Sequence, residues 1–376
     1  MQIKIDGVVQ GGDGLGRLEN NKAVFVPGAL KGETVEITIT KESKSHCKAK
    51  LDNIISASKY RVEPICPFYG QCGGCNLQHL DVEEQVRVKE EILLNHLERF
   101  GKLDLSDIKI EKSETGPAFN YRNRVRFHVD LNKKRVGFLR AGSKELIEID
   151  RCPILDDKLN EELADSVNIL KVARNNMFNN RGRGKYIEVP AFAGDDDVSF
   201  DKKNVTITIM GHRYTLNANV FFQSNPQMLE KMLKYVVSNV EEGSVMDLYS
   251  GVGTFSAFLP EGTISVEKQS ECLSLSKLNA PMSVPFTGEV ENWSKKRKDS
   301  VDTIVVDPPR TGLFEKVPHM LSKFGAKRII YVSCNPVTLA RDLNLLTEEG
   351  YKVSSVKMFD FYPQTHHMES VVILNK

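Results

Sequence analysis

The chain has 376 residues, of which 40% are hydrophobic and 27% are charged, and its 51 basic and 50 acidic residues leave a net charge of +1. This length predicts two or three globular domains, and the composition excludes a disordered or collagen-like chain. No apolar run reaches the roughly 18 residues of a membrane helix, and the start, MQIKIDGVVQ, lacks the apolar core of a secretion signal. We therefore expect a cytoplasmic protein. Because the global charge favours no partner, a nucleic-acid binder would need a local basic patch.

Two regions precede the C-terminal part of the chain. Residues 1–58 contain short runs rich in β-branched residues, such as AVFVPGAL and ETVEITIT, separated by glycine turns, and this pattern predicts a small β-barrel. Residues 59–220 are expected to form a mixed α+β central domain with a cysteine-rich start. Within this central domain, the segment DVEEQVRVKEEILLNHLERFGKL predicts a helix. Its apolar face carries Val82, Val86, Leu93 and Leu97.

The C-terminal domain, residues 221–376, alternates helical stretches with short β-rich runs. These runs are VMDLY, GTISVE, VDTIVVD and RIIYVS. Such alternation predicts a parallel sheet of the doubly wound, Rossmann-like type, so the fold class is α/β. The last two runs, YKVSSVKMF and MESVVIL, are expected to form an antiparallel hairpin at the edge of this sheet.

A glycine turn follows the first of these strands. In VMDLYSGVGTFS, Gly251 and Gly253 would let the backbone approach a ligand closely. Glu267 lies twenty residues after Asp247, at the end of the next strand, where a carboxylate can bind ribose hydroxyls. Ser256 stands where a dinucleotide fingerprint has Gly or Ala, which disfavours an NAD enzyme. An ordinary strand-to-helix turn is the alternative.

The third strand ends in DPPRTGL, which puts Asp307 at the edge where ligands bind open α/β sheets. Asp/Asn-Pro-Pro-aromatic loops of this kind resemble those of S-adenosylmethionine-dependent amino methyltransferases. In this chain Arg310 occupies the position of the aromatic residue, and this departure disfavours methylation of a base nitrogen.

A cysteine and a glutamate complete the candidate site. Cys334, in SCNP, precedes a predicted helix, whose dipole should lower the pKa of the thiol. Glu369 follows His366 and His367, which should point to opposite faces of a strand and therefore not share a metal. A thiolate that adds to C6 of uracil makes C5 nucleophilic towards a methyl donor, and a base then removes the C5 proton. The alternatives are a small buried cysteine and an exposed carboxylate.

Five motifs appear in order along nearly the whole chain: FFQSNPQM, DLYSGVG, DPPRTGL, SCNP and PQTHHMES. Together they resemble the RNA uracil-5-methyltransferase family, in particular its branch that modifies large-subunit rRNA. The resemblance implies a Rossmann-like S-adenosylmethionine-dependent methyltransferase domain with Cys334 as the nucleophile and Glu369 as the base. By similarity the cofactor contacts are Gln223, Tyr249, Glu267 and Asp307, beside Gly251 and Gly253, and Thr254 stands where members often carry Asn. The N-terminal segment resembles a TRAM domain, an oligonucleotide-binding-type barrel.

Four cysteines form a second candidate site: Cys66, Cys72 and Cys75 in CPFYGQCGGC, and Cys152 in RCPIL. Four thiolates suit zinc or a [4Fe–4S] cluster, and the five-residue first spacer fits paired zinc spacing less well. The resemblance implies a [4Fe–4S] cluster with a structural or RNA-positioning role. Four unrelated buried cysteines are the alternative.

Basic residues concentrate at residues 121–144, where strand alternation places Arg122, Arg124 and Arg126 on one face. Tyr121, Phe127 and Phe138 are interleaved with the basic residues of this segment and are candidates for stacking on RNA bases, and RGRGK at 181–185 adds a basic loop. A solvated strand face is the alternative. We expect a monomeric enzyme that methylates C5 of a uridine in RNA, with 23S rRNA preferred and tRNA possible. A base N-methyltransferase and a non-catalytic iron–sulfur RNA-binding protein remain the other hypotheses.

Overall fold

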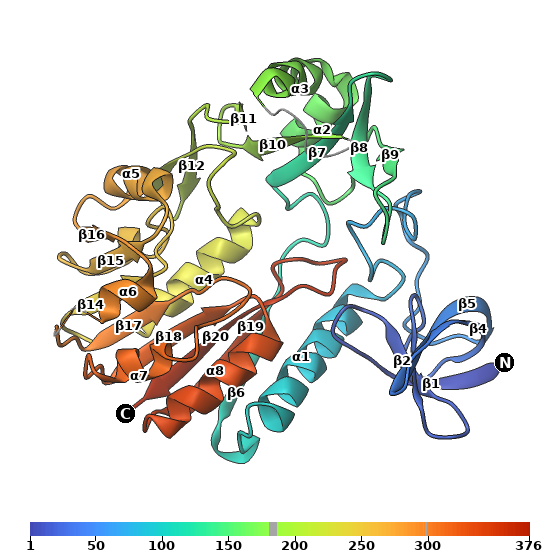
Figure 1. The fold of residues 1–376 in the computed structure, drawn as a ribbon, viewed down its shortest axis with the longest axis horizontal. Helices are drawn as coiled ribbons and strands as arrows, with labels where there is room; N and C mark the ends of the chain where they lie inside the picture. Colours follow the sequence, from blue (N-terminus) through green and yellow to red (C-terminus); the bar gives the residue numbers. More distant parts are fainter. Residues whose placement is uncertain (180–185, 296, 298) are drawn as a thin grey trace. The chain divides into compact units, whose positions relative to one another are not determined.

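The computed structural model describes residues 1–179, 186–295, 297 and 299–376 (Figure 1). The chain divides into two compact units, each assembled from segments that are distant in sequence. The first unit contains Met1–Ile92, Phe138–Ile147 and Tyr362–His367, and the second contains Leu93–Gly137, Glu148–Phe361 and Met368–Lys376. Within the described residues, no helix has the length and apolar character needed to span a membrane.

The N-terminal segment forms a closed five-stranded barrel in the order β1-β2-β3-β5-β4 (Figure 1, blue). Its strands are β1 (Gln2–Val8), β2 (Gly14–Arg17), β3 (Ala23–Val26), β4 (Thr34–Glu42) and β5 (His46–Ser56). Buried residues alternate with exposed ones along β1 and β4, so one face of each strand lines the barrel core. The sequence pattern did not predict β2, because glycines usually indicate turns. A Cβ at Gly14 would lie 2.7 Å from the Ala29 carbonyl oxygen, so the close approach of the Ala29 backbone requires glycine there.

After the barrel comes the predicted helix, α1 (Val82–Arg99). Leu93 and Leu97 are buried as expected, but Val82 and Val86 are only half-buried. Gln85 and Lys89 occupy the buried face instead, each with 0% exposure. The predicted apolar face was therefore wrong in the first half of the helix, where polar side chains are buried together with their hydrogen-bond partners.

Two smaller sheets occupy the middle of the chain. One has the order β11-β10-β7-β8-β9, and the other pairs β12 with β13. Their strands are β7 (Arg124–Asp130), β8 (Arg135–Leu139), β9 (Leu146–Glu148), β10 (Ile187–Ala193), β11 (Val198–Phe200), β12 (Val205–Ile209) and β13 (His212–Leu216). The helices of this region are η1 (Leu105–Asp107), α2 (Asp157–Asp165) and α3 (Val167–Asn179).

The C-terminal part forms an eight-stranded sheet in the order β16-β15-β14-β17-β18-β20-β19-β6 (Figure 1). The strands are β14 (Val245–Leu248), β15 (Ile264–Glu267), β16 (Val284–Thr287), β17 (Thr303–Val306), β18 (Arg328–Ser333), β19 (Lys352–Phe359), β20 (Glu369–Asn375) and β6 (Lys109–Glu114). The first five strands of that order are parallel, and β20 runs antiparallel to β18 and β19. The predicted parallel α/β sheet and its final antiparallel hairpin are therefore confirmed.

Helices connect these strands: α4 (Pro226–Ser238), η2 (Ser256–Phe258), α5 (Ser270–Asn279), α6 (Val290–Ser294), α7 (Val317–Ser322) and α8 (Pro336–Glu348). The sequence predicted that this hairpin would form the edge of the sheet, and that prediction was wrong, because β6 lies outside β19. β6 pairs in parallel with β19, although residues 109–114 were assigned to the central domain. The charged sequence KIEKSE concealed this strand, because an edge strand that stays largely solvated needs little apolar surface.

Candidate active site

The sheet reverses its winding direction between β14 and β17, which lie side by side although two strands, β15 and β16, separate them in chain order. In open α/β sheets, ligands bind at such a switch point, beyond the carboxyl ends of the strands. Tyr249, Asp307 and Cys334 directly follow β14, β17 and β18. Glu369 begins β20, which is antiparallel, and its neighbour Ser370 is opposite Ser333. The structure thus brings these predicted residues to one rim, all within the second unit.

The glycine loop after β14 is shaped by residues in the left-handed region of backbone space. Gly251 and Gly253 have φ values of +54° and +83°. A Cβ at Gly253 would lie 2.9 Å from Ser276 Oγ, whereas a Cβ at Gly251 would meet nothing within 4 Å. Gly253 is thus required for packing, and Gly251 leaves open space beside the backbone. This difference fits a ligand that approaches at Gly251.

Two carboxylates brace this loop. Glu267 accepts the Gly251 N–H at 3.0 Å through Oε2 and the Gln269 N–H at 2.6 Å through Oε1. Asp247 accepts the Ser256 N–H at 3.0 Å and the Ser256 hydroxyl at 2.5 Å, both through Oδ2. Burial raises the pKa of Asp247 to about 7 despite these bonds. Ser256, which departs from the dinucleotide fingerprint, therefore has a local role in tying η2 to β14.

Other predicted cofactor residues surround the loop. Tyr249 has φ +62°, and its hydroxyl donates to Glu291 Oε1 at 2.8 Å. The Thr254 carbonyl accepts from the Tyr214 hydroxyl at 2.7 Å. Gln223 is buried, and among the described residues its Oε1 has no hydrogen-bond partner. An unsatisfied buried acceptor is costly, so Gln223 fits a group that receives a hydrogen bond from a ligand.

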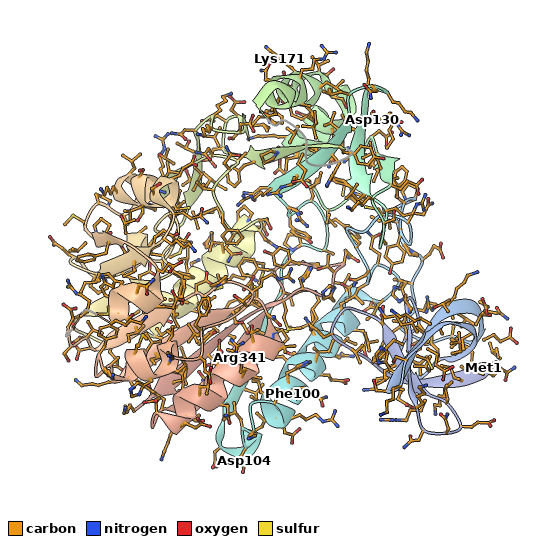
Figure 2. All side chains as sticks on the ribbon, in the orientation of Figure 1. Met1, Phe100, Asp104, Asp130, Lys171 and Arg341 are labelled. Carbon is orange, nitrogen blue, oxygen red and sulfur yellow. The ribbon has the colours of Figure 1, made fainter. Side chains whose placement is uncertain are left out.

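The loop that begins at Asp307 is held by α8. Asn335 Nδ2 and Thr338 Oγ1 donate to the Arg310 carbonyl at 2.9 and 3.2 Å. Further along the loop, the Leu313 N–H donates to Asp342 Oδ2 at 2.6 Å. Arg341, labelled on α8 in Figure 2, donates to the Thr311 carbonyl at 2.9 Å. These four side chains of α8 and its N-cap were missed at the sequence level, because only the fold shows which helix faces the loop.

Cys334 does not have the lowered pKa that the sequence suggested. Burial, and after it the nearby Glu369 and Asp307 carboxyls, raise the pKa of the thiol to about 12, and Arg310 partly opposes them. Asn335, the N-cap of α8, accepts the Val337 N–H with its side chain. Cys334 thus lies outside the first helical turn, where a helix dipole has its effect. Burial and two carboxyl groups outweigh that dipole.

Glu369 is 2% exposed, and among the described residues its Oε2 has no hydrogen-bond partner. Burial, followed by repulsion from Asp307, raises its pKa well above the usual value. Burial and the neighbouring Asp247 likewise raise the pKa of Asp307 to about 7. A desolvated carboxylate is a strong base, so Glu369 suits the removal of a proton from a bound ligand, and the Cys334 thiol beside it is a candidate nucleophile. Nucleophile-and-base chemistry is what this pair can perform.

The predicted RNA face has a different structure from the one expected. Arg124 and Arg126 share a face of β7, whereas Arg122 precedes the strand, and its Nε donates to the Arg124 carbonyl. Arg126 is exposed and forms an ion pair with Glu188 at 2.9 Å. Tyr121 and Phe127, at 4% and 0% exposure, are core residues and cannot stack on bases, so the expectation was wrong for these two, whereas Phe138 is half-buried. The RGRGK segment, 181–185, lies outside the described residues.

Three of the four candidate metal-binding cysteines, Cys66, Cys72 and Cys75, belong to the first unit, and Cys152 belongs to the second. The Gly74 N–H points to Cys72 Sγ at 3.4 Å, and burial, with a smaller effect of Cys66, raises the pKa of Cys72. Backbone N–H groups directed at sulfur suit a metal-bound thiolate. Across the described residues, however, no three His, Cys, Asp or Glu side chains are grouped to hold a metal ion. Four thiolates fit an iron–sulfur cluster chemically, but the described residues do not show these cysteines grouped around a common point.

Known proteins resemble this chain over its whole length. Residues 1–51 match the TRAM domain, and residues 295–376 match the family described as tRNA (Uracil-5-)-methyltransferase. An "Uncharacterized RNA methyltransferase" of Aquifex aeolicus is 32% identical, over 100% of this chain and 98% of that protein. The 23S rRNA (uracil(1939)-C(5))-methyltransferase RlmD of Shewanella woodyi is 31% identical, over 94% of this chain and 91% of that protein.

A solved structure shares the fold. It is the Pyrococcus abyssi tRNA (uracil-54, C5)-methyltransferase in complex with S-adenosyl-L-homocysteine, with a TM-score of 0.77 and 22% identity. The alignment covers 100% of this chain and 99% of that one. The TRAM match and the matches to full-length RNA methyltransferases carry the family assignment, and the solved structure agrees with it in fold. The chain belongs to the RNA uracil-5-methyltransferase family.

Proposed function

We propose that this protein transfers a methyl group to C5 of a uridine in RNA through a covalent adduct with Cys334. The observation that carries the proposal is the placement of Cys334 and Glu369 on one rim, close enough for Glu369 to raise the thiol pKa. The glycine loop and Asp307 lie along the same edge of the sheet. A base N-methyltransferase would need neither a nucleophile nor a base beside it.

The residues act in a sequence whose protons and bonds balance. The Cys334 thiol releases its proton to solvent, its sulfur bonds to C6 of uracil, and the C5–C6 double bond opens to an enolate whose nucleophilic carbon is C5. S-adenosylmethionine, when bound, supplies the methyl group that C5 acquires. Glu369, as the carboxylate, then takes the C5 proton, the C6–S bond breaks, and the C5–C6 double bond re-forms. The uridine must be outside a base stack to reach the rim.

The cofactor is proposed to lie along the glycine loop. Gly251 offers open backbone, Gln223 offers an unsatisfied acceptor, and Tyr249, Thr254 and Glu267 border the same loop. Asp307 links this region to the reacting groups, since it influences the pKa of Glu369. All of these residues belong to the second unit of one chain, so a monomer suffices for the chemistry.

We propose 23S rRNA as the substrate, since full-length relatives carry that activity in their names, with a tRNA uridine as the second candidate. RNA is proposed to contact Arg122, Arg124 and Arg126. Arg126 is the most exposed of the three and is available to phosphates once it separates from Glu188. The TRAM barrel adds a second surface of a type that binds RNA.

We also propose that Cys66, Cys72, Cys75 and Cys152 ligate a [4Fe–4S] cluster, and no step of the reaction passes through it. The sulfur-only donor set and the Gly74 N–H at Cys72 support this. Anaerobically purified protein should absorb at about 400 nm and lose this band in Cys75→Ala. Colourless protein that binds zinc would contradict the proposal.

The reaction is tested by nucleoside mass spectrometry of unmodified rRNA and tRNA incubated with S-adenosylmethionine. Wild type and Cys334→Ala are compared side by side. We expect 5-methyluridine from the wild type and a loss of at least about 1,000-fold in the variant. Methylated adenine, guanine or cytosine would favour an N-methyltransferase. RNA binding with no methylation of either RNA would favour a non-catalytic binding protein.

A further inference from the structure

The connection between β19 and β20 belongs to a different unit from its strands. Tyr362–His367 lies in the first unit, whereas β19 and β20 lie in the second. The connection ends two residues before Glu369, the proposed base. Residues that hold it therefore control the backbone immediately before the base.

Gln85 of α1 makes a reciprocal amide pair with Gln364. Gln85 Oε1 accepts the Gln364 N–H at 2.8 Å, and Gln85 Nε2 donates to Gln364 Oε1 at 3.1 Å. The same Nε2 donates to the Leu77 and Leu80 carbonyls, at 3.1 and 2.8 Å. Gln85 is 0% exposed, so its polar atoms depend on these partners.

Gln364 itself is held in an unfavourable conformation. Its φ is +72°, in the left-handed region that non-glycine residues rarely adopt. Its carbonyl accepts the Asn76 and Leu77 N–H groups at 3.1 and 2.9 Å. Such a conformation persists only where surrounding contacts determine it, and it often occurs where position matters for function. Here those contacts come from the segment that follows Cys75.

Asn76 provides the second attachment. Its Oδ1 accepts the His366 N–H at 2.9 Å, and its Nδ2 lies 2.8 Å from His366 Nδ1. The same Nδ2 donates to the Gly11 carbonyl of the barrel. Gly12 is required beside it, because a Cβ there would lie 2.7 Å from Asn76 Nδ2. Asn76 thus ties the barrel, the cysteine segment and the connection to one point.

We propose that Asn76 and Gln85 are positioning residues for Glu369, which they act on through the connection Tyr362–His367. Neither residue touches the reacting atoms. The inference rests on the proposed function, because it assigns these residues to the step in which Glu369 removes the C5 proton. Loss of either attachment should slow that step and leave the earlier bond from Cys334 to C6 intact.

The test uses full-length protein with Asn76→Ala, Asn76→Asp and Gln85→Leu, and Asn53→Ala as a control elsewhere in the first unit. Asn53 is exposed, and its side chain makes only a long bond of 3.4 Å to Glu36. We expect kcat to fall about 10- to 100-fold in Asn76→Ala and Gln85→Leu, with KM for RNA and S-adenosylmethionine within about twofold. Asn76→Asp keeps the acceptor for the His366 N–H and should recover part of the rate. Asn53→Ala should match the wild type.

The deciding measurement is the amount of denaturant-stable protein–RNA adduct at steady state. A displaced base leaves the methylated adduct unresolved, so adduct should accumulate in proportion to the loss of kcat. Glu369→Gln provides the reference for full accumulation. If that variant accumulates none, the proposed reaction fails. If Glu369→Gln accumulates adduct, two results for the Asn76 variants overturn the positioning role: an unchanged rate, or a lower rate with no accumulation of adduct. Gln85→Leu leaves the Leu77 and Leu80 carbonyls without the donor they have in the wild type, so this variant risks not folding. In that case the Asn76 variants decide the test, because Asn76 is only half-buried.

Discussion

The two ends of the candidate site differ in how the oxygens of their carboxyl groups are hydrogen-bonded. At the glycine loop, both oxygens of Glu267 accept backbone N–H groups. At the reacting end, Glu369 is fully desolvated, and one of its oxygens has no partner among the described residues. Hydrogen bonds to the charged form stabilise it, whereas burial without them raises the pKa. Glu267 is thus arranged to hold a fixed structure, and Glu369 is arranged to take up a proton.

The comparison also explains why the thiol is not activated in the free protein. Burial and two neighbouring carboxyl groups, partly offset by Arg310, raise the pKa of Cys334 to about 12. A helix dipole alone cannot overcome this. Activation must come with the ligands, since a cationic cofactor offsets the carboxyl charges and a bound base presents C6 to the sulfur.

The largest predicted effect distinguishes the two glutamates. Glu369→Gln should lower kcat by about 100- to 10,000-fold with little change in KM, because the base is lost. Glu267→Gln should instead raise KM for S-adenosylmethionine more than it lowers kcat, because it loosens the glycine loop. Steady-state kinetics of both variants checks this. An equal loss of kcat in both variants would remove the distinction.

The second prediction concerns thiol reactivity. With a pKa of about 12, Cys334 should react with iodoacetamide roughly 100-fold faster at pH 9 than at pH 7, because the thiolate fraction rises about tenfold per pH unit. The positively charged S-adenosylmethionine should lower the apparent pKa relative to the uncharged sulfur of S-adenosylhomocysteine. Peptide mass spectrometry at Cys334 measures the rates. A plateau below pH 8 without ligand would show that the thiol is already activated.

The third prediction separates the two glycines of the loop. Gly253→Ala combines left-handed backbone strain with a 2.9 Å approach to Ser276 Oγ, so it should cost about 2 to 4 kcal/mol of unfolding free energy. Gly251→Ala meets open space and should cost only about 1 to 2 kcal/mol, with weaker cofactor binding as its main effect. Denaturant titration and calorimetric binding measure these quantities. The reverse order of stability losses would contradict the packing role of Gly253.

The smallest effect concerns the RNA face. Glu188→Gln releases Arg126 from its exposed ion pair and should tighten RNA binding about twofold, with almost no change in stability. Arg126→Gln should weaken binding and reduce the salt slope of log K by about 1. Filter binding across salt concentrations measures both. An unchanged slope in Arg126→Gln would exclude a phosphate contact.

Much of the second unit could be predicted from sequence, because its strands are short apolar runs that end in polar residues. Asp307, Cys334 and Glu369 were expected at strand ends, and strand ends are where the structure places them. β6 and β2 were missed because charge and glycine mask strands that pairing and barrel closure stabilise. The direction of the Cys334 pKa shift was mispredicted because it depends on how deeply the thiol is buried and on which carboxyl groups surround it, and local sequence contains neither.

Helix α1 shows the same limit. Apolar periodicity favoured Val82 and Val86 as core residues, but the structure buries Gln85 and Lys89. Lys89 Nζ donates to the Tyr362 carbonyl at 3.1 Å, and Gln85 binds Gln364. These partners are more than 270 residues away in sequence. Periodicity identifies faces that bury hydrocarbon, and it cannot identify a face that buries hydrogen bonds to a distant segment.

The central claim is that Cys334 activates C5 and that the C5 proton leaves through Glu369. It is tested most directly with unmodified rRNA that carries tritium at C5 of uridine, by counting tritium released to water against methyl groups transferred. We expect one tritium released per methyl group in the wild type and none in Cys334→Ala. In Glu369→Gln, methylated RNA should remain bound to protein with its tritium retained. Methylation that leaves tritium on free product RNA, or tritium release that survives Cys334→Ala, would contradict the account.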